Sequence, residues 1–381
     1  MNMLYHPTQA AARRRLRVTM LGLRGFPDVQ GGVETHVENL SRRLAELGCD
    51  VEAIVRSSYV PHDKARVWHG VTLHPIWSPR IKGVEAFVHT FLGVLRAART
   101  RPDVLHIHAI GPALFTPLAR LAGLRVVVTH HSVNYEYEKW NRLARAILRL
   151  GERAGMGFAQ GRIAVSQDLA AHVQRVCSVA VDVIPNGIVP PPVIRSTTAL
   201  QTFGLVPQRY VLNVARLDPE KRQADLIAAF ARARHPEWKL ALVGGADYAD
   251  AYSGAVHDAA RKVPGVVMLG RQTHDALAEL YAHAGVFVMP SAREGQPIAV
   301  LEAIGHGCPV LLSDIPAHRE IGAAAQYFAV GDIAGLTEQL RWTFDRLPLR
   351  SPIAERERIM AAHDWRRIAE QTLDVYLAMH R

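Results

Sequence analysis

The chain has 381 residues, of which 49% are hydrophobic and 21% are charged, and its formal net charge is +10 at pH 7. This length exceeds what a single core usually supports, so we expect two globular domains. Every window of about 18 to 20 residues contains charged or helix-breaking residues, which argues against a membrane-spanning helix.

The amino-terminal stretch MNMLYHPTQAAARRRLRV has its arginines after its small residues, an order that is wrong for a secretory signal, so we expect a cytoplasmic protein. The cysteines Cys49, Cys177 and Cys308 lie far apart and without a metal-binding partner at ligand spacing. They therefore predict neither a disulfide framework nor a zinc site.

The positive charge is concentrated in residues 1–195, whereas residues 196–381 are nearly neutral. A basic half indicates an anionic partner, which could be nucleic acid, a phosphorylated substrate or an anionic membrane surface. A solvated, arginine-rich surface would give the same composition. Nucleic acid is not expected as a partner, because no recognisable nucleic-acid-binding motif accompanies the charge.

Short runs rich in valine and isoleucine alternate with stretches of helical period, and this alternation runs through both halves of the chain. In the first half, strands are predicted at residues 17–23, 50–55, 103–109, 125–131, 161–166 and 180–185, and helices at 33–47 and 85–99. In the second half, strands are predicted at 209–217, 238–245, 265–271, 285–291 and 308–314, and a helix at about 222–234.

The expected fold class is therefore α/β, with two Rossmann-like, doubly wound domains facing a central cleft. Pro-Asn-Gly at 185–187 closes the last strand of the first half, and the three prolines at 190–192 cannot extend a strand or a helix. We predict a first domain over 1–187 and a second over 188–362. Ligands of such domains bind beyond the carboxyl ends of the strands.

Gly31 and Gly32 follow the first predicted strand and open a helix. The glycine spacing does not fit a dinucleotide fingerprint, and no Walker A lysine follows. Free backbone N–H groups at a helix N-terminus can still bind a phosphate, although a plain tight turn would use the same glycines.

Two cations, Arg216 and Lys221, follow the first strand of the second half. Arg216 lies just past the strand end, and Lys221 comes five residues later at the start of the next helix. Such a pair can neutralise a diphosphate, and the arginine can do so bidentately. An ordinary surface pair is the alternative.

Glu294 and Glu302 flank Pro297 in the stretch SAREGQPIAVLEAIGHGCPVLLSD. Pro297 is expected as the first helical residue, which leaves Glu294 in a loop and places Glu302 about 7.5 Å along the helix axis. Two carboxylates on different elements do not suggest a glycosidase pair, which must face one bond. They fit better as hydrogen-bond acceptors for two separated parts of one ligand.

His130 and His131 end a predicted buried strand, where an imidazole could position a sugar hydroxyl or share a proton, and a structural histidine is the alternative. His106 and His108 alternate along another strand, but no acidic third ligand lies nearby, so a metal is not expected. The sequence also lacks a D-x-D motif, which would supply ligands for a metal on a diphosphate.

A basic amphipathic helix is predicted after the histidines. Its arginines Arg142, Arg145, Arg149 and Arg153 share one face, and Leu143, Ile147, Leu150 and Ala154 share another. This pattern is typical of a contact with anionic lipid or with a phosphorylated acceptor, and a solvated face on a packed helix is the alternative.

The motifs EGQPIAVLEAIGHGCPV, ARLDPEKR, IPNG, GGVETHV and VVVTHHS together resemble those of the GT4-type retaining glycosyltransferases of GT-B fold. The resemblance covers nearly the whole chain. The stretches GLRGFP and THHSVNYEYEKWNR are similar to a bacterial exopolysaccharide and capsule subgroup with rhamnosyl- and mannosyltransferase-like members. Residues 363–381 resemble the last helix of the family, which crosses back onto the first domain.

The resemblance implies a nucleotide diphosphate sugar as donor, held mainly by the second domain, without a cofactor or a metal. Glu302 would bind the ribose hydroxyls, Glu294 would lie near the donor sugar, and His131 would lie near the transferred sugar. The diphosphate would be bound by residues from both domains, namely Arg216, Lys221, Gly31 and Gly32.

One position departs from the family pattern. The family often has Phe-Gly after the first Glu-Gly, where backbone N–H groups meet the sugar, but here Gln296 and Pro297 follow Gly295. Gly295 and Gln296 are still expected at the donor. Pro297 has no N–H to give, so that hydrogen bond could come from Ile298 instead.

The expected function is metal-independent, retaining transfer of a sugar to a lipid-linked or oligosaccharide acceptor, in bacterial surface or exopolysaccharide biosynthesis at the inner face of the membrane. A nucleotide-sugar epimerase of related fold is an alternative, but no carboxylate cluster in the first half supplies its acid and base groups. A non-catalytic nucleotide-sugar-binding protein is another, although it would tolerate the loss of Lys221 or Glu294, and both are present.

Overall fold

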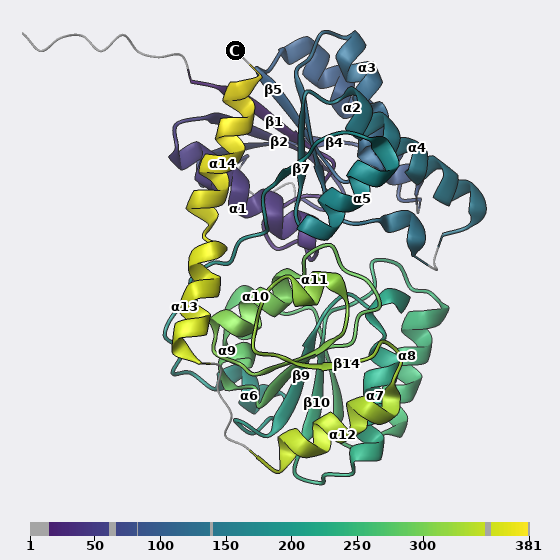
Figure 1. Ribbon diagram of the computed structural model, residues 1–381, viewed down its shortest axis with the longest axis vertical. Helices are drawn as coiled ribbons and strands as arrows, with labels where there is room; N and C mark the ends of the chain where they lie inside the picture. Colours follow the sequence, from purple (N-terminus) through teal and green to yellow (C-terminus); the bar gives the residue numbers. More distant parts are fainter. Residues whose placement is uncertain (1–14, 61–65, 82, 138–139, 347–351, 380–381) are drawn as a thin grey trace, which may run out of the picture.

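The computed structural model describes residues 15–60, 66–81, 83–137, 140–346 and 352–379. Two α/β domains lie one above the other, each built around its own sheet (Figure 1), which confirms the expected fold class. Residues 1–14, on which the expectation about a secretory signal rests, lie outside the described residues. Within the described ranges, no helix is both long enough and apolar enough to cross a membrane.

The first domain contains an eight-stranded sheet, in which all neighbouring strands are parallel except β3 and β4. In spatial order its strands are β3 (Val67–Trp68), β4 (Val71–Ile76), β2 (Asp50–Arg56), β1 (Arg17–Leu21), β5 (Val104–His108), β6 (Val126–His130), β7 (Gly161–Ala164) and β8 (Asp182–Val183). Its helical segments are α1 (Gly32–Glu46), α2 (Val84–Thr100), η1 (Pro112–Phe115), α3 (Thr116–Leu121), η2 (Asn134–Glu136), α4 (Arg142–Phe158) and α5 (Gln167–Cys177).

The second domain contains a six-stranded parallel sheet. In spatial order its strands are β11 (Val266–Gly270), β10 (Lys239–Val243), β9 (Tyr210–Val214), β12 (Val286–Met289), β13 (Val310–Ser313) and β14 (Gln326–Phe328). Its helical segments are α6 (Thr198–Thr202), η3 (Pro219–Lys221), α7 (Gln223–Ala233), α8 (Ala251–Lys262), α9 (His274–His283), α10 (Ile298–Gly305), α11 (Pro316–Arg319) and α12 (Ile333–Phe344).

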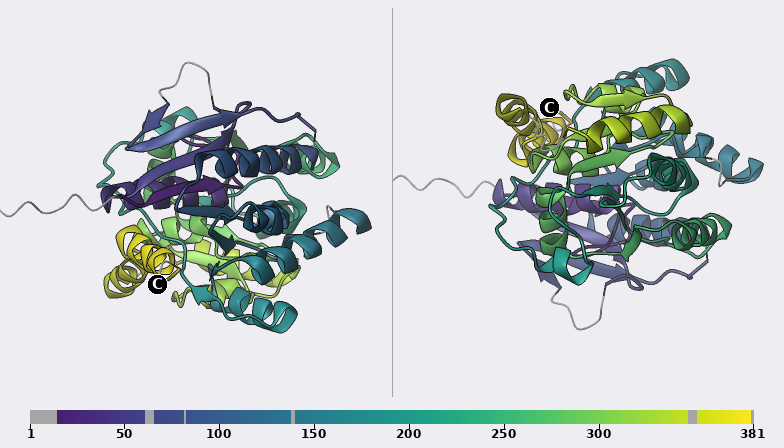
Figure 2. Two further views of the ribbon diagram at one scale, coloured as in Figure 1. Left: turned by 90° about the horizontal axis from the view of Figure 1, so that it is seen from above. Right: turned by 90° about the horizontal axis from the view of Figure 1, so that it is seen from below.

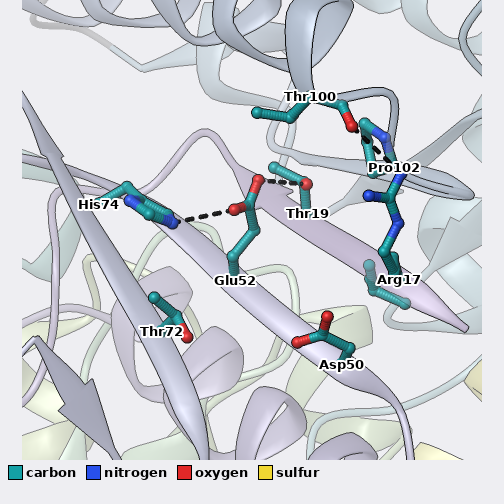
Figure 3. Close-up of a pocket in the computed structure, with 9 residues that line it drawn as sticks. Arg17, Thr19, Asp50, Glu52, Thr72, His74, Thr100 and Pro102 are labelled. Carbon is teal, nitrogen blue, oxygen red and sulfur yellow. Dashed lines mark hydrogen bonds and ion pairs between the residues drawn. The ribbon is translucent and has the colours of Figure 1, made fainter. Parts of the chain in front are cut away.

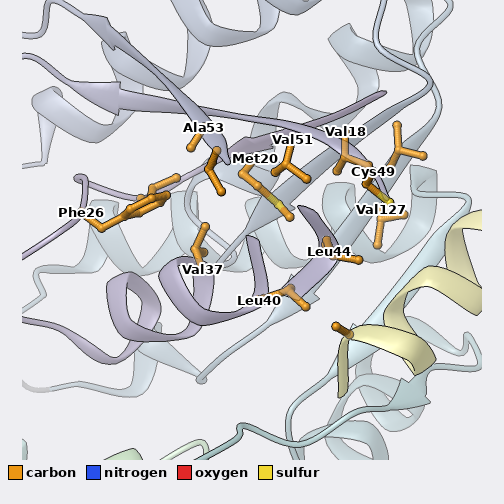
Figure 4. Close-up of a cluster of buried hydrophobic side chains, with 14 of the residues drawn as sticks. Val18, Met20, Phe26, Val37, Leu40, Leu44, Cys49, Val51, Ala53 and Val127 are labelled. Atoms are coloured by element: carbon orange, nitrogen blue, oxygen red, sulfur yellow. The ribbon is translucent and has the colours of Figure 1, made fainter. Parts of the chain in front are cut away.

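The last two helices, α13 (Ile353–Ala362) and α14 (Trp365–Ala378), run from the second domain up along the first (Figure 1). α14 packs against α1. Its buried side chains, among them Trp365, Ile368 and Tyr376, belong to the same apolar cluster as Val18 and Leu44 of the first domain. Figure 4 shows this cluster between the sheet and α1. The carboxyl-terminal helix therefore completes the core of the first domain.

Three strands and one helix start differ from the sequence prediction. β3 and β14 are too short to give a periodic signal, and β4 is interrupted by Pro75, which is tolerated near the end of a strand. Pro297 is not the first helical residue: it is the N-cap of α10, with φ −80° and ψ 108°, and the helix begins at Ile298. The extended ψ explains the shift, because a residue at ψ 108° lies outside the helical region.

A cavity of about 200 Å³ lies in the first domain, lined by the first residues of β1, β2 and β4 and by the end of α2 (Figure 3). Glu52 inside it accepts a hydrogen bond from Thr19 at 2.7 Å and pairs with His74 at 3.0 Å. This cavity is at the amino ends of the strands. Ligands of doubly wound domains bind at the opposite, carboxyl edge, where the candidate site lies.

Candidate active site

The first-domain side of the site is the loop between β1 and α1. Gly31 is the N-cap of α1, and no side chain caps this helix. A side chain on Gly31 would collide with Arg24 and Glu34, whereas a Cβ on Gly32 would have no atom within 4 Å. The first turn of α1 therefore presents backbone N–H groups at the positive end of the helix dipole, which suits a phosphate.

Arg24, in the same loop, links the two domains. Its guanidinium pairs with Glu34 at 3.0 Å and with Asp247 of the second domain at 2.5 Å. Burial opposes the charge on Arg24, but the two carboxylates outweigh that effect and raise its pKa above the ordinary value. The arginine is thus a fixed cation beside Gly31.

Arg216 and Lys221 come from the second domain, after β9. Arg216 pairs with the other oxygen of Asp247 at 2.8 Å, so one carboxylate lies between Arg24 and Arg216. Burial would raise the pKa of Asp247, but the two arginines lower it, which keeps the carboxylate ionised. Arg271 lies 3.6 Å from the same carboxylate, so the structure collects arginines from both domains around one anion.

Lys221 meets Glu294 at 2.5 Å. Burial favours the neutral carboxyl of Glu294 and would raise its pKa. The charge and the hydrogen bond of Lys221 outweigh this effect, so the pKa of Glu294 is lowered. Glu294 lies in the loop after β12, as predicted, and this loop reaches across to the first domain. A Cβ on the next residue, Gly295, would collide with the backbone carbonyl of His131.

His131 is 9% exposed and follows β6. Its Nε2 lies 3.1 Å from Nδ1 of His108. The neighbouring His130 points elsewhere: its Nε2 lies 2.7 Å from Glu152 of α4, which also accepts from Tyr135 at 2.9 Å. The His131 ring therefore lies with His36 and His108, the His130 ring lies with Glu152, and it is the backbone carbonyl of His131 that meets Gly295.

Glu302 is the fifth residue of α10 and has no cationic partner among the interactions of the described residues. Its Oε2 accepts a hydrogen bond from Tyr281 at 3.0 Å. Burial raises the pKa of Glu302 to about 7, and the Tyr281 bond only partly opposes this. One acceptor oxygen is thus held in place by a tyrosine, while the carboxylate carries no countercharge.

Gln296 joins the second domain to the segment after β8. Its Oε1 accepts from the backbone N–H of Asn186 at 2.5 Å, and its carbonyl oxygen accepts from the Asn186 amide at 2.9 Å. Ile298 is buried at the start of α10, which has no side-chain cap. The Gln296 side chain therefore accepts a hydrogen bond from the first domain in this structure.

The sequence reasoning missed Arg24 and Asp247. Asp247 follows β10 just as Glu294 follows β12, so a search of the loop after every predicted strand for charged residues would have found it. The same search would have found Arg24, which is a charged residue in the loop after β1. Their contact across the domains was not predictable, because it depends on how the two sheets face each other.

The two halves of the chain match two families of known proteins. Residues 30–190 match Glycosyltransferase Family 4, and residues 202–358 match Glycosyl transferases group 1. The alpha-maltose-1-phosphate synthase of Mycolicibacterium smegmatis is 28% identical over 95% of this chain and 99% of its own length.

A second similar protein from the same organism is a phosphatidyl-myo-inositol mannosyltransferase, which is 28% identical over 92% of this chain and 90% of its own. Among solved structures, the sucrose-phosphate synthase of Thermosynechococcus elongatus superposes with a TM-score of 0.80 at 22% identity, covering 96% of this chain and 99% of that one.

Each family match covers one of the two domains and its sheet. The strand-end loops that carry Gly31, Arg216 and Glu294 meet between the two domains. The relatives span nearly the whole chain, so the similarity includes both domains and the residues that join them. The chain is therefore a glycosyltransferase of the GT-B fold, built from a GT4-type first domain and a group 1 second domain, and it transfers a sugar from a nucleotide sugar.

Proposed function

We propose that this glycosyltransferase moves a hexosyl or deoxyhexosyl group from a nucleotide diphosphate sugar to a lipid-linked glycan acceptor, with retention of configuration, in bacterial surface or exopolysaccharide biosynthesis. The observation that carries the proposal is the convergence of Arg24, Arg216 and Lys221 on one region where the two domains meet. Arg24 lies beside the N-terminus of α1 and shares Asp247 with Arg216, and Lys221 follows the same strand as Arg216, so both domains offer cations for a diphosphate.

In this proposal the diphosphate replaces the carboxylate of Asp247 between the two arginines. Arg216 would bind it bidentately, Lys221 would stabilise the charge that develops on the leaving phosphate, and Gly31 and Gly32 would approach it with backbone N–H groups. The site then needs no metal for the transfer, because these cations meet the charge that a metal would otherwise neutralise.

Retention follows from attack on the same face of the sugar that the phosphate leaves. The acceptor oxygen bonds to the anomeric carbon as the bond from that carbon to the phosphate oxygen breaks, and the departing phosphate takes the acceptor's proton. The chain contributes positioning and charge stabilisation. His131 and the backbone of Gly295 hold the transferred sugar, Glu294 lies beside it, and Glu302 accepts from the ribose hydroxyls.

The acceptor is proposed to be membrane-bound because of a surface on the first domain. Both α2 and α4 pack against η1. Together with the segment before α2, these helices leave large apolar side chains exposed, from 39% for Phe91 to 70% for Leu143, and the set is Trp77, Ile81, Phe87, Phe91, Leu143, Ile147 and Leu150. We call this the α2–α4 surface. In Figure 1 the first half of α4 projects at the edge of the molecule.

The charge on the α2–α4 surface favours an anionic bilayer over a protein partner. Arg142, Arg149 and Arg153 are exposed on α4, and Arg145 is partly exposed and donates to the carbonyl of Tyr137 at 3.3 Å. Apolar side chains interleaved with arginines match the acyl and headgroup layers of a membrane surface. A relative that acts on phosphatidyl-myo-inositol supports a lipid acceptor. We therefore place the protein at the inner face of the cell membrane.

The experiment is a donor panel. Purified protein is incubated with UDP-, GDP- and dTDP-sugars, with and without a lipid diphosphate acceptor, and release of the nucleoside diphosphate is measured. The transferase predicts release that increases when the acceptor is added, and nuclear magnetic resonance of the product should show the donor's anomeric configuration. An epimerase would instead convert the sugar without any acceptor. No turnover with any donor would overturn the proposal.

A further inference from the structure

Three histidines from separate elements meet beside the interdomain contact. His36 lies on α1, His108 ends β5, and His131 follows β6. Each offers a ring nitrogen, and the three nitrogens lie within 4.8 Å of one another. The ring centroids of His36 and His131 are 4.8 Å apart, and those of His108 and His131 are 5.4 Å apart.

Hydrogen bonding fixes the tautomer of His36. The Asn186 amide nitrogen donates to the backbone carbonyl of Gln296, which can only accept, so Oδ1 of Asn186 is the atom that faces Nδ1 of His36 at 2.8 Å. Nδ1 of His36 must therefore carry the proton. Its Nε2 is left with a bare lone pair, and this atom is buried without a hydrogen-bond partner.

His108 is in a similar state. It is fully buried, and its Nε2 also has no hydrogen-bond partner, while its Nδ1 shares one proton with Nε2 of His131. Burial lowers the pKa of His36 to about 4 and the pKa of His108 and His131 well below the ordinary value. The cluster thus offers three neutral imidazoles, which is the form that binds metal ions.

We propose that His36, His108 and His131 form a binding site for one divalent transition-metal ion of the zinc class, and that its occupation inhibits the enzyme. Three imidazoles with a fourth position left open are a known zinc ligand set, and imidazole suits zinc, copper and nickel. The bond from His36 Nδ1 to an amide carbonyl is the second-shell contact that orients such ligands.

The geometry requires a small contraction. Nitrogens around a tetrahedral zinc lie about 3.4 Å apart, given a Zn–N distance of about 2.1 Å. Nδ1 of His108 and Nε2 of His131, 3.1 Å apart, are already close to this separation, and the proton between them moves to the far nitrogen of its own ring when both atoms bind the metal. The three nitrogens lie within 4.8 Å of one another, so the widest pair must close by on the order of 1 Å at most for a zinc ion to bind.

Inhibition follows from the identity of the third ligand, and this part rests on the proposed function. A metal that holds the His131 ring against His36 and His108 withdraws it from the transferred sugar. The same metal anchors Asn186, which joins both domains through Gln296 and through the carbonyl contact to His363 at 2.7 Å. Transfer itself uses no metal, so zinc should only lower the rate.

The test uses the full chain without a histidine tag, stripped of metal and titrated with Co²⁺. One equivalent should give the visible absorption of tetrahedral Co²⁺, and Zn²⁺ should displace it. His36→Gln and His108→Gln should bind at least about 10-fold more weakly. His89→Gln is the matched control, because His89 is equally buried on α2 and lies outside the cluster.

His36→Cys keeps the site testable where the glutamine variants fail to fold. A thiolate also binds these metals, so this variant should retain Co²⁺ with an added sulfur charge-transfer band. In the donor assay, Zn²⁺ should lower the wild-type rate, a chelator should restore it, and the ratio of rates with and without zinc should approach one in His36→Gln. An absent tetrahedral spectrum, or unchanged affinity in His36→Gln, overturns the site whether or not turnover is found.

Discussion

Gly295 of the second domain lies directly against the backbone carbonyl of His131 in the first. Only a residue without a side chain fits there, because a Cβ would collide with that carbonyl. The contact brings the loop of Glu294 to the end of β6. This contact fixes how closely the two domains approach each other here. It therefore also fixes the separation of the proposed donor-binding residues, which come from both domains.

Gly295→Ala should therefore separate the domains locally without unfolding either of them. We expect kcat/KM to fall about 100-fold, since a misplacement of about 1 Å of reacting groups has that effect. The melting temperature should change little. Gly254→Ala on α8, where a Cβ meets no atom within 4 Å, is the control and should keep full activity. Normal turnover in Gly295→Ala would contradict the importance of this contact.

Lys221→Met tests the ion pair with Glu294. Loss of the cation should lower kcat about 10²- to 10³-fold, because the leaving phosphate loses its charge stabilisation. The unpaired carboxylate should cost about 3 kcal/mol of unfolding free energy at neutral pH. Lys221→Arg keeps the charge and should retain most of the stability. Kinetics and urea unfolding distinguish the two variants, and an active Lys221→Met would refute the role.

The pair also predicts how stability depends on pH. In the wild type the pKa of Glu294 lies below the ordinary value of 4.5, so its stabilisation is present above that value and is lost as the pH falls through the lowered pKa. In Lys221→Met burial is opposed only by the hydrogen bond from Ser291 and by His318, so the pKa of Glu294 rises relative to the wild type. The variant should therefore gain stability relative to wild type as the pH falls from 7 to 5, measured by urea unfolding.

Glu302 has the opposite behaviour in the wild type. Its pKa is raised from 4.5 to about 7, so the folded state holds a proton that the unfolded state releases, and stability falls as the pH rises between these values. The loss is at most about 3 kcal/mol. Glu302→Gln should abolish this dependence and be more stable than wild type at pH 8.

The same residue links pH to donor binding. The ionised carboxylate accepts hydrogen bonds from ribose hydroxyls more strongly, so nucleotide-sugar affinity should rise through pH 7 in the wild type and stay flat in Glu302→Gln. Isothermal titration at pH 6 and pH 8 measures both. Equal affinity of the two proteins at pH 8 would remove the assigned role.

Replacement of Arg142, Arg145, Arg149 and Arg153 by glutamine should weaken binding to anionic vesicles about 100-fold or more, since each arginine near the surface contributes about 1 kcal/mol. The control removes the same charge from the second domain, at the exposed residues Arg209, Arg232, Arg234 and Arg261, and should bind normally. Co-sedimentation with phosphatidylserine vesicles compares them. Binding that is insensitive to the first replacement, or to salt, would exclude the α2–α4 surface.

The strand-end residues were predictable because the apolar runs of a parallel sheet mark its carboxyl edge. Glu294, Arg216 and Lys221 could be placed there from spacing alone. The partners of these residues were not predictable, since Asp247 meets Arg24 only through the relative orientation of two sheets. His36 was missed for the same reason: it belongs to the GGVETHV motif, but it joins His108 and His131 only when α1 packs on the sheet.

The position of α14 has a consequence for the order of folding during synthesis. Trp365, Ile368 and Tyr376 are at most 2% exposed and pack into the core of the first domain, although they follow the whole second domain in the chain. A first domain usually folds while the rest of the chain emerges. Here the surface that α14 covers stays open until the second domain has been synthesised, so the first domain reaches its final stability only after the second has been made.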